Sequence, residues 1–179
     1  MMMQIVKYGS AVLREKAKQV FKVDDGIRRL AKDMLETMYA AKGVGLAAEQ
    51  VGRTERMCVI DVPKDAEKEL YRESNAKAVK MPLVLINPVI TKKEGRQRNE
   101  EGCLSFPDIG APITRANEVT VEYLDLEGKP QTATACGLLA RAIQHETDHL
   151  DGILLVDKLS ALQKMSISGQ LKRLQQANQ

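Results

Sequence analysis

Residues 145–149 read His145-Glu146-Thr147-Asp148-His149, and they contain both histidines of the chain. On an α-helix, residues four positions apart lie on one face, so these two imidazoles can bind a single metal ion. The glutamate after the first histidine can reach a water at that ion and act as a base. The stretch therefore predicts a metal-binding helix. The alternative is a chance match on an amphipathic helix whose histidines are hydrogen-bonded in the core.

The residues on either side extend this helix. Gly137 and Gly152 bracket the segment and mark where a helix can begin and end. Between them the apolar side chains recur at the spacing of one helix face. These positions are Leu138, Leu139, Ala142, Ile143 and Leu150.

A catalytic site of the zinc type takes three protein ligands and leaves one position open for water. No third histidine exists, so the third ligand has to be a cysteine, aspartate or glutamate. Cys58 lies in an apolar run that reads as a strand, and Cys136 precedes the glycine that opens the helix; both suit packed thiols. Cys103 instead lies among Gly, Ser and Pro residues, which mark irregular backbone where a thiolate can approach a metal. Cys103 is therefore the favoured third ligand beside His145 and His149.

Three stretches of the chain belong together. Residues 43–50 read Gly-Val-Gly-Leu-Ala-Ala-Glu-Gln, residues 101–105 read Glu-Gly-Cys-Leu-Ser, and residues 144–150 read Gln-His-Glu-Thr-Asp-His-Leu. Complete and in this order, they resemble the three signature motifs of the peptide deformylase family. The resemblance covers nearly the whole chain. Glu49 occupies a position of the first motif that varies within the family.

The resemblance implies an enzyme that hydrolyses the N-formyl group of N-formylmethionyl nascent polypeptides and releases formate. It implies one divalent metal ion held by Cys103, His145 and His149. A thiolate and two imidazoles suit zinc, iron, cobalt or nickel, and spacing does not choose among these metals. The family implies Fe²⁺, with Zn²⁺, Ni²⁺ or Co²⁺ as substitutes.

The resemblance also assigns roles to residues around the metal. Glu146 is the base, while the Gln50 side-chain amide and the backbone N–H of Leu104 stabilise the oxyanion. Val44 and Gly45 bind the peptide backbone. Apart from the resemblance, we expect Glu101 to line the substrate pocket.

Plainer readings exist for several of these residues. Gln50 alone reads as a solvated loop residue, Gly43 and Gly45 as turn residues, and Glu101 as a solvated glutamate. Asp148 is better interpreted as a structural hydrogen-bond or ion partner than as a fourth ligand.

Two other functions use the same helix. A zinc endopeptidase is disfavoured, because the known proteases with this helix motif take Glu, His or Asp as third ligand. A catalytically silent peptide-binding relative is disfavoured because it would need neither Glu146 nor Gln50.

Composition is that of a compact globular protein. The chain has 179 residues, which predicts one domain over residues 1–179, and 44% of them are hydrophobic. No run approaches the roughly 18 apolar residues of a membrane span, and the start has no signal-peptide pattern. The three cysteines do not suggest a secreted disulfide framework, so we expect a cytoplasmic protein. A net charge of +3, four tyrosines, two phenylalanines and no tryptophan argue against specific nucleic-acid binding.

The pattern of elements predicts an α+β fold, with mixed or antiparallel strands packed around the central histidine helix and a C-terminal helix. We expect helices at residues 10–18, from Asp24 or Asp25 to about 43, and at about 160–177. Strands are expected at 46–48, 57–62 and 83–92, with a hairpin of 119–124 and 132–135. Residues 64–80 read as a solvated loop. Lys164, Lys172 and Arg173 favour a solvated face on the last helix and leave open a transient contact with a ribosome.

Overall fold

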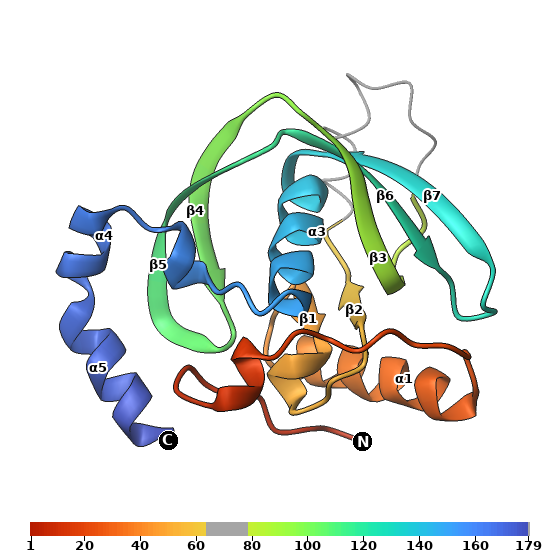
Figure 1. The fold of residues 1–179 in the computed structure, drawn as a ribbon, viewed down its shortest axis with the longest axis horizontal. Helices are drawn as coiled ribbons and strands as arrows, with labels where there is room; N and C mark the ends of the chain where they lie inside the picture. Colours follow the sequence, from red (N-terminus) through yellow and green to blue (C-terminus); the bar gives the residue numbers. More distant parts are fainter. Residues whose placement is uncertain (64–78, 179) are drawn as a thin grey trace.

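The computed structural model describes residues 1–63 and 79–178 (Figure 1). Two antiparallel sheets surround a central helix, α3, in an α+β arrangement. The helices are α1 (Asp25–Ala40), α3 (Gly137–Leu150), α4 (Ala161–Ser166) and α5 (Ser168–Ala177), with 3₁₀ turns η1 (Ala11–Arg14), η2 (Ala48–Val51) and η3 (Leu155–Lys158). The strands are β1 (Gly45–Ala47), β2 (Met57–Ile60), β3 (Leu83–Glu94), β4 (Gln97–Cys103), β5 (Phe106–Arg115), β6 (Glu118–Leu124) and β7 (Pro130–Cys136).

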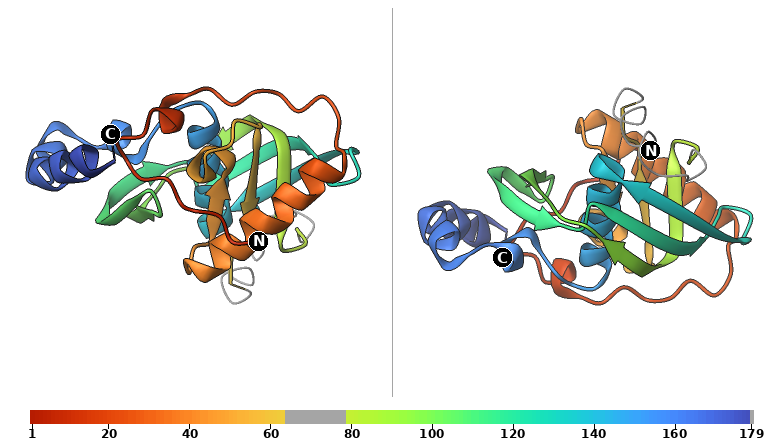
Figure 2. Two further views of the ribbon diagram at one scale, coloured as in Figure 1. Left: turned by 90° about the horizontal axis from the view of Figure 1, so that it is seen from below. Right: turned by 90° about the horizontal axis from the view of Figure 1, so that it is seen from above.

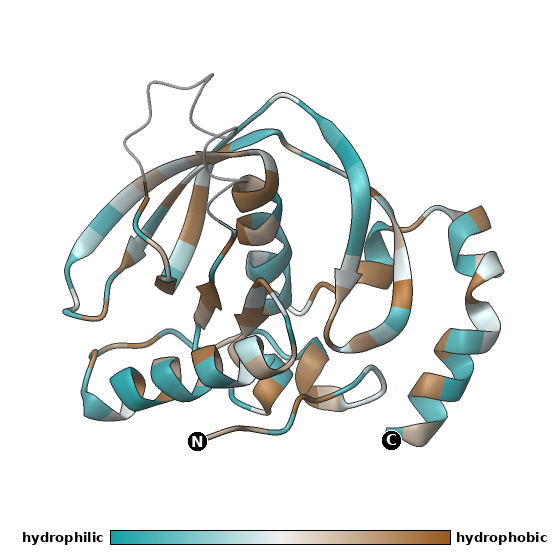
Figure 3. Cartoon of the chain, turned by 180° about the vertical axis from the view of Figure 1, so that it is seen from behind, coloured by the Kyte–Doolittle hydropathy of each residue, from teal (hydrophilic) through white to brown (hydrophobic). Residues whose placement is uncertain are grey.

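The larger sheet is covered on both faces. Its five strands run in the order β1-β2-β3-β6-β7, and each pair is antiparallel. In β2, Met57 and Val59 pack with α1, whereas Cys58 and Ile60 pack with α3. A strand buried on both faces is apolar at every position rather than alternating. The views in Figure 2 and the brown colour of β1 and β2 in Figure 3 agree with this layering.

Helix α3 lies between the large sheet and the smaller β4–β5 sheet (Figure 1). Leu139, Ile143 and Leu150 are fully or almost fully buried in one core cluster with residues of β2, β3, β6 and β7. The polar residues of its second half are buried too, among them His145, Glu146 and His149. Burial of polar groups has a free-energy cost unless they are paired, so this half of the helix needs partners.

Several elements expected from the sequence are confirmed. Asp24 caps α1, since its carboxylate accepts a hydrogen bond from the Ile27 N–H at 3.0 Å. The β6–β7 hairpin pairs Glu118 with Cys136 through to Leu124 with Pro130. Within the described residues, no helix has the length and apolarity needed to cross a membrane.

Both ends of the chain differ from the expectation. The helix expected at 10–18 is only the single turn η1, and Ser10 makes no side-chain cap. The C-terminal helix is divided at Ile167, which packs partly against the third core cluster. The Ser166 and Ser168 hydroxyls donate to carbonyls of the preceding turn, at Gln163 and Met165, and such bonds compete with regular helix.

The β4–β5 hairpin was not expected. Residues 100–107 read as irregular backbone, yet they form the ends of two strands joined at Leu104 and Ser105. Pro107 and Pro112 argue against a strand, but a two-stranded sheet consists of edges, which tolerate proline. The expected loop at 64–80 lies almost wholly outside the described residues.

Candidate active site

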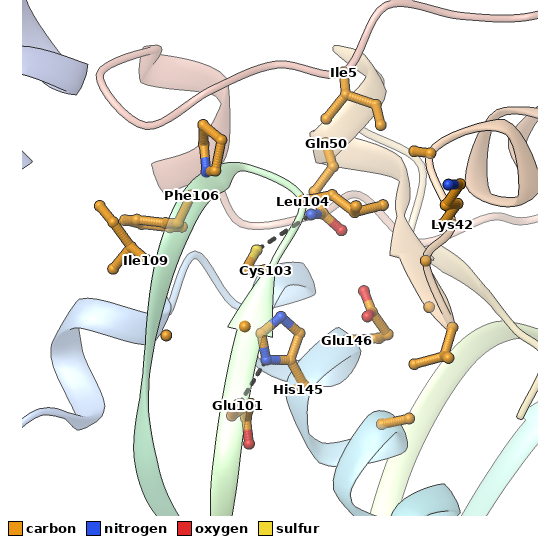
Figure 4. A pocket seen from close by; sticks show the side chains of 18 of the residues that line it. Ile5, Lys42, Gln50, Glu101, Cys103, Leu104, Phe106, Ile109, His145 and Glu146 are labelled. Carbon is orange, nitrogen blue, oxygen red and sulfur yellow. Dashed lines mark hydrogen bonds and ion pairs between the residues drawn. The ribbon is translucent and has the colours of Figure 1, made fainter.

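The predicted metal ligands come together from two elements. His145 and His149 project from the middle and last turn of α3, and Cys103 ends β4. One ligand atom from each of the three side chains lies within 4.8 Å of the other two. The Cys103 Sγ lies 3.2 Å from the His149 Nε2. Figure 4 shows Cys103 and His145 next to each other.

The donor set fits a divalent transition metal. His145 Nδ1 bonds the Glu101 Oε1 at 2.6 Å, which leaves its Nε2 to act as a ligand. Burial lowers the pKa of His149 well below its usual value, which favours the neutral imidazole that a ligand needs. At His145 burial also disfavours the charged ring, but hydrogen bonds to Cys103 and Glu101 raise its pKa well above the usual value, so metal binding there would release a proton. Among the described residues, these three form a group that can hold one ion.

Glu101 lies in the pocket wall, but its carboxylate is not solvated. It forms ion pairs with Arg115, at 2.6 Å between Oε1 and Nη2, and with Arg141. Burial alone would raise the pKa of Glu101, but His145 and Arg115 bring it well below its usual value. The reading as a solvated glutamate is wrong. Glu101 lines the groove, as expected, while its oxygens bind three side chains and hold His145 in place.

Asp148 fits the role given to it from the sequence. Its carboxylate pairs with Arg115, and more distantly with Lys158 at 3.5 Å. It is not one of the three residues grouped as metal ligands. Asp148 is therefore a structural ion partner.

Gln50 is buried beside the metal group, so the solvated-loop reading is wrong. Its Nε2 donates to Cys103 Sγ at 3.4 Å and to Ser105 Oγ at 3.2 Å, and its Oε1 accepts from the Ala47 N–H. Leu104 follows Cys103 in the turn between β4 and β5. Figure 4 shows the Gln50 amide next to Cys103 and to the Leu104 side chain.

Gly43 and Gly45 lie close to other side chains, and Gly43 also closes a turn, since its N–H donates to the Met38 carbonyl at 2.9 Å. A Cβ on Gly45 would collide with the Glu146 carboxylate, and one on Gly43 would lie 2.7 Å from the Leu104 Cδ1. The absence of side chains lets β1 pass directly over Glu146. Burial raises the pKa of Glu146 to about 7, and its Oε2 has no hydrogen-bond partner within the described part of the chain. A buried carboxylate with a free oxygen suits a general base.

A groove of about 700 Å³ leads to these residues. Its walls include Val44 and Gly45 on one side and the α3 residues Leu138 and Ala142 on the other. Arg141 also contributes to the lining, but its guanidinium points to Glu101 and to the Ile113 carbonyl. Ile5 and Lys7 line the groove as well, and no sequence motif pointed to them.

Glu49 is a buried acid for which the sequence predicted no role. It is fully buried, and neither carboxylate oxygen has a hydrogen-bond partner among the described residues. Burial raises the pKa of Glu49 to about 8, with the nearby charges of Glu146 and Asp151 adding to the effect and Arg56 opposing it. The folded protein therefore holds a proton here between about pH 4.5 and 8, where the unfolded chain does not.

We expect Glu49→Gln to gain stability over the parent protein as pH rises from 5 to 8. The free energy of unfolding of the parent falls across this window. The reason is that the unfolded chain releases the Glu49 proton, whereas the folded protein keeps it. Denaturant unfolding at both pH values should show the difference between the proteins growing by about 2–4 kcal/mol. Glu15→Gln, at an exposed position, is the matched control. Parallel stability curves for parent and Glu49→Gln would contradict the buried proton.

Known proteins resemble this chain over most of its length. The family model described as polypeptide deformylase matches residues 2–165. A peptide deformylase of Picosynechococcus is 50% identical over 167 residues, covering 92% of this chain and 82% of the relative. A peptide deformylase of Nitrosococcus oceani is 45% identical over 173 residues, covering 97% of this chain and 96% of the relative.

Solved structures show the same likeness. The crystal structure of peptide deformylase from Ehrlichia chaffeensis has a TM-score of 0.88 and 35% identity, covering 99% of this chain and 98% of that one. The crystal structure of a peptide deformylase from Synechococcus elongatus, in complex with actinonin, has a TM-score of 0.82 and 40% identity. The match covers 94% of this chain and 87% of that one. The chain belongs to the peptide deformylase family.

Proposed function

We propose that this peptide deformylase removes the formyl group of N-formylmethionyl chains with Glu146 as base and Cys103, His145 and His149 as metal ligands. Removal of N-formyl groups from nascent peptides is the activity of the family to which the chain belongs. The residue roles rest on the convergence of the three ligand atoms within 4.8 Å beside a buried glutamate. We also propose that residues 1–179 act as a single catalytic domain.

The geometry supports a role for each of these residues in the reaction. When bound, the ion supplies a Lewis acid that polarises the formyl carbonyl and lowers the pKa of water. Glu146 accepts a proton from the attacking water and returns it to the leaving amine. The Gln50 amide and the Leu104 N–H donate to the oxygen that gains negative charge; one such donor contributes about 10²–10³ in rate. Glu101 keeps the His145 ring oriented through its Nδ1 bond.

The peptide is proposed to bind as an added strand. β1 lies at the end of the five-stranded sheet, so its outer edge lacks a strand partner in that sheet. Its first residue Gly45, with Val44 before it, lines the groove. An extended peptide can hydrogen-bond to such an edge, which gives affinity with little dependence on side chains. The formyl end would then point toward Glu146.

The metal is proposed to be Fe²⁺. We expect iron-loaded protein, prepared without oxygen, to release formate from formyl-Met-Ala-Ser faster than the zinc form, and to lose activity in air. A thiolate ligand makes both the ferrous ion and the sulfur open to oxidation. Nickel-loaded protein should decay more slowly. Equal decay rates of the iron and nickel forms under oxygen would contradict the proposal, while absence of formate release with every metal would contradict the function itself.

We expect a graded preference for methionine, or its straight-chain isostere norleucine, after the formyl group. Leu138 and Ala142 line the groove, and the nearby Arg141 charge is occupied by Glu101. One methylene in such a pocket contributes about 1–3 kcal/mol, so shortening the side chain should lower kcat/KM stepwise. Equal kcat/KM values for formyl-Met and formyl-Asp peptides would contradict this pocket.

The same assay separates the alternative functions. An endopeptidase would cleave internal bonds of an unformylated peptide, and a silent relative would bind the peptide without releasing formate. The cytoplasmic location and the transient ribosome contact stay predictions.

A further inference from the structure

The N-terminal segment joins two of the three motif regions. The Val6 N–H donates to the Gln50 carbonyl at 2.8 Å, and the Tyr8 N–H donates to the Ser105 carbonyl at 2.9 Å. Between them, Lys7 Nζ donates to the Leu104 carbonyl at 2.7 Å. Tyr8 also stacks on Phe106, with ring centroids 4.8 Å apart. Residues 5–8 thus connect the region of Gln50 to the turn that carries Leu104; Figure 4 shows Ile5 at this junction.

The Leu104–Ser105 turn needs such support. It joins β4 to β5 directly after Cys103, where the strand register shifts. A hydrogen bond to a carbonyl of this turn restricts the backbone dihedrals on either side of it. Lys7 binds the Leu104 carbonyl, Tyr8 binds the next one, and Gln50 binds the Ser105 hydroxyl. These bonds restrict the backbone around Leu104, on which the direction of its N–H depends.

Within the described residues, the Leu104 carbonyl is the hydrogen-bond partner of the Lys7 ammonium. No carboxylate of the described part of the chain lies within ion-pair distance of it, in contrast to Arg14 and Arg56. It is half-buried in the groove wall rather than exposed. A hydrogen bond from a charged donor is stronger than one between neutral groups, so it can fix a peptide plane.

We propose that Lys7 is a positioning residue for the oxyanion site, acting through the Leu104 carbonyl. The inference rests on the proposed role of the Leu104 N–H. Lys7 sets the plane of the peptide that follows Leu104, and thereby the aim of the N–H that precedes it. Misalignment of a transition-state donor lowers kcat, whereas substrate affinity depends on the β1 edge and the apolar pocket.

The test compares Lys7→Met, Lys7→Arg and the control Lys16→Met, an exposed lysine on the same segment. With metal-replete protein and formyl-Met-Ala-Ser, we expect Lys7→Met to lose about 10–10²-fold in kcat with KM little changed. Lys7→Arg should recover most of the rate, because a guanidinium can donate to the same carbonyl. Lys16→Met should match the parent protein. If Lys7→Met does not fold, Lys7→Gln is judged by the same kcat and KM criteria.

Unchanged kcat in Lys7→Met would overturn the inference. A raised KM with unchanged kcat would also overturn it, since Lys7 would then contact the substrate directly. Gln50→Leu separates this failure from failure of the oxyanion assignment. If Gln50→Leu loses about 10²–10³-fold in kcat and Lys7→Met loses nothing, only the role of Lys7 is wrong. If neither variant loses rate, the oxyanion assignment itself is wrong.

Discussion

Cys103→Ser is expected to lose its metal and, with it, formate release. The Cys103 Sγ lies 3.2 Å from the His149 Nε2 and within 4.8 Å of both histidine ligand atoms. A serine hydroxyl is a much poorer ligand than a thiolate for a borderline-soft ion, so we expect metal affinity to fall by more than about 10²-fold. The two histidines that remain do not complete a three-ligand site.

The other two cysteines are matched controls. Cys58 and Cys136 are buried in the core cluster that contains Leu139 and Ile143, and neither belongs to the group that can hold an ion. Cys58→Ser and Cys136→Ser should keep their metal. Their free energy of unfolding should fall only by the cost of burying a hydroxyl in the core. Metal content by plasma mass spectrometry decides the matter. Full occupancy in Cys103→Ser, or loss in either control, would remove Cys103 from the ligand set.

The parts of the fold predicted from sequence are those with a strong local signal. α3 has two bracketing glycines and an apolar face, and its bounds, Gly137–Leu150, match the expectation. α1 begins after the capping Asp24, and the β6–β7 hairpin shows alternation and a turn. The candidate ligands were identified because so few residue types can bind a transition metal, and this chain has only two histidines.

The parts that were missed depend on partners distant in sequence. β4 is polar and β5 contains prolines, so each is a strand only because the other pairs with it. Glu101 resembles a surface residue until Arg115, Arg141 and His145 enclose it from two other elements. Lys7 lies 97 positions from the carbonyl it binds. Composition and periodicity report on neighbours along the chain, so they carry no information about such contacts.

Glu49 illustrates a different limit. A charged residue beside Gln50 in a turn is expected at the surface, since unpaired acids are almost never fully buried. Here the turn η2 follows β1 directly into the core, and the backbone path carries Glu49 inside. Local sequence cannot distinguish this from an exposed turn.

Glu146→Gln is expected to keep its metal and lose catalysis. On a helix, Glu146 is rotated by about 100° from His145, so it cannot bind the same ion as that ligand does. Its carboxylate instead lies against Gly45, below the groove, while His145 faces Glu101 and Cys103 (Figure 4). The glutamine keeps the size and shape of the side chain but lacks the basic oxygen. Metal content should therefore change little, and thermal stability should not fall, because the glutamine removes a buried acid whose pKa is raised to about 7.

The kinetic effect should be confined to the chemical step. General acid–base help contributes about 10²–10⁴-fold, and Glu146 acts first as base and then as acid, so kcat should fall by at least this amount. The dissociation constant of the unformylated product peptide Met-Ala-Ser should be unchanged, because the β1 edge and the apolar pocket are intact. Glu122→Gln, an exposed glutamate on β6, serves as the control. A metal-replete Glu146→Gln protein with near-normal kcat would overturn the mechanism. Among the described residues that line this groove, Glu146 is the one with a buried carboxylate oxygen that lacks a hydrogen-bond partner.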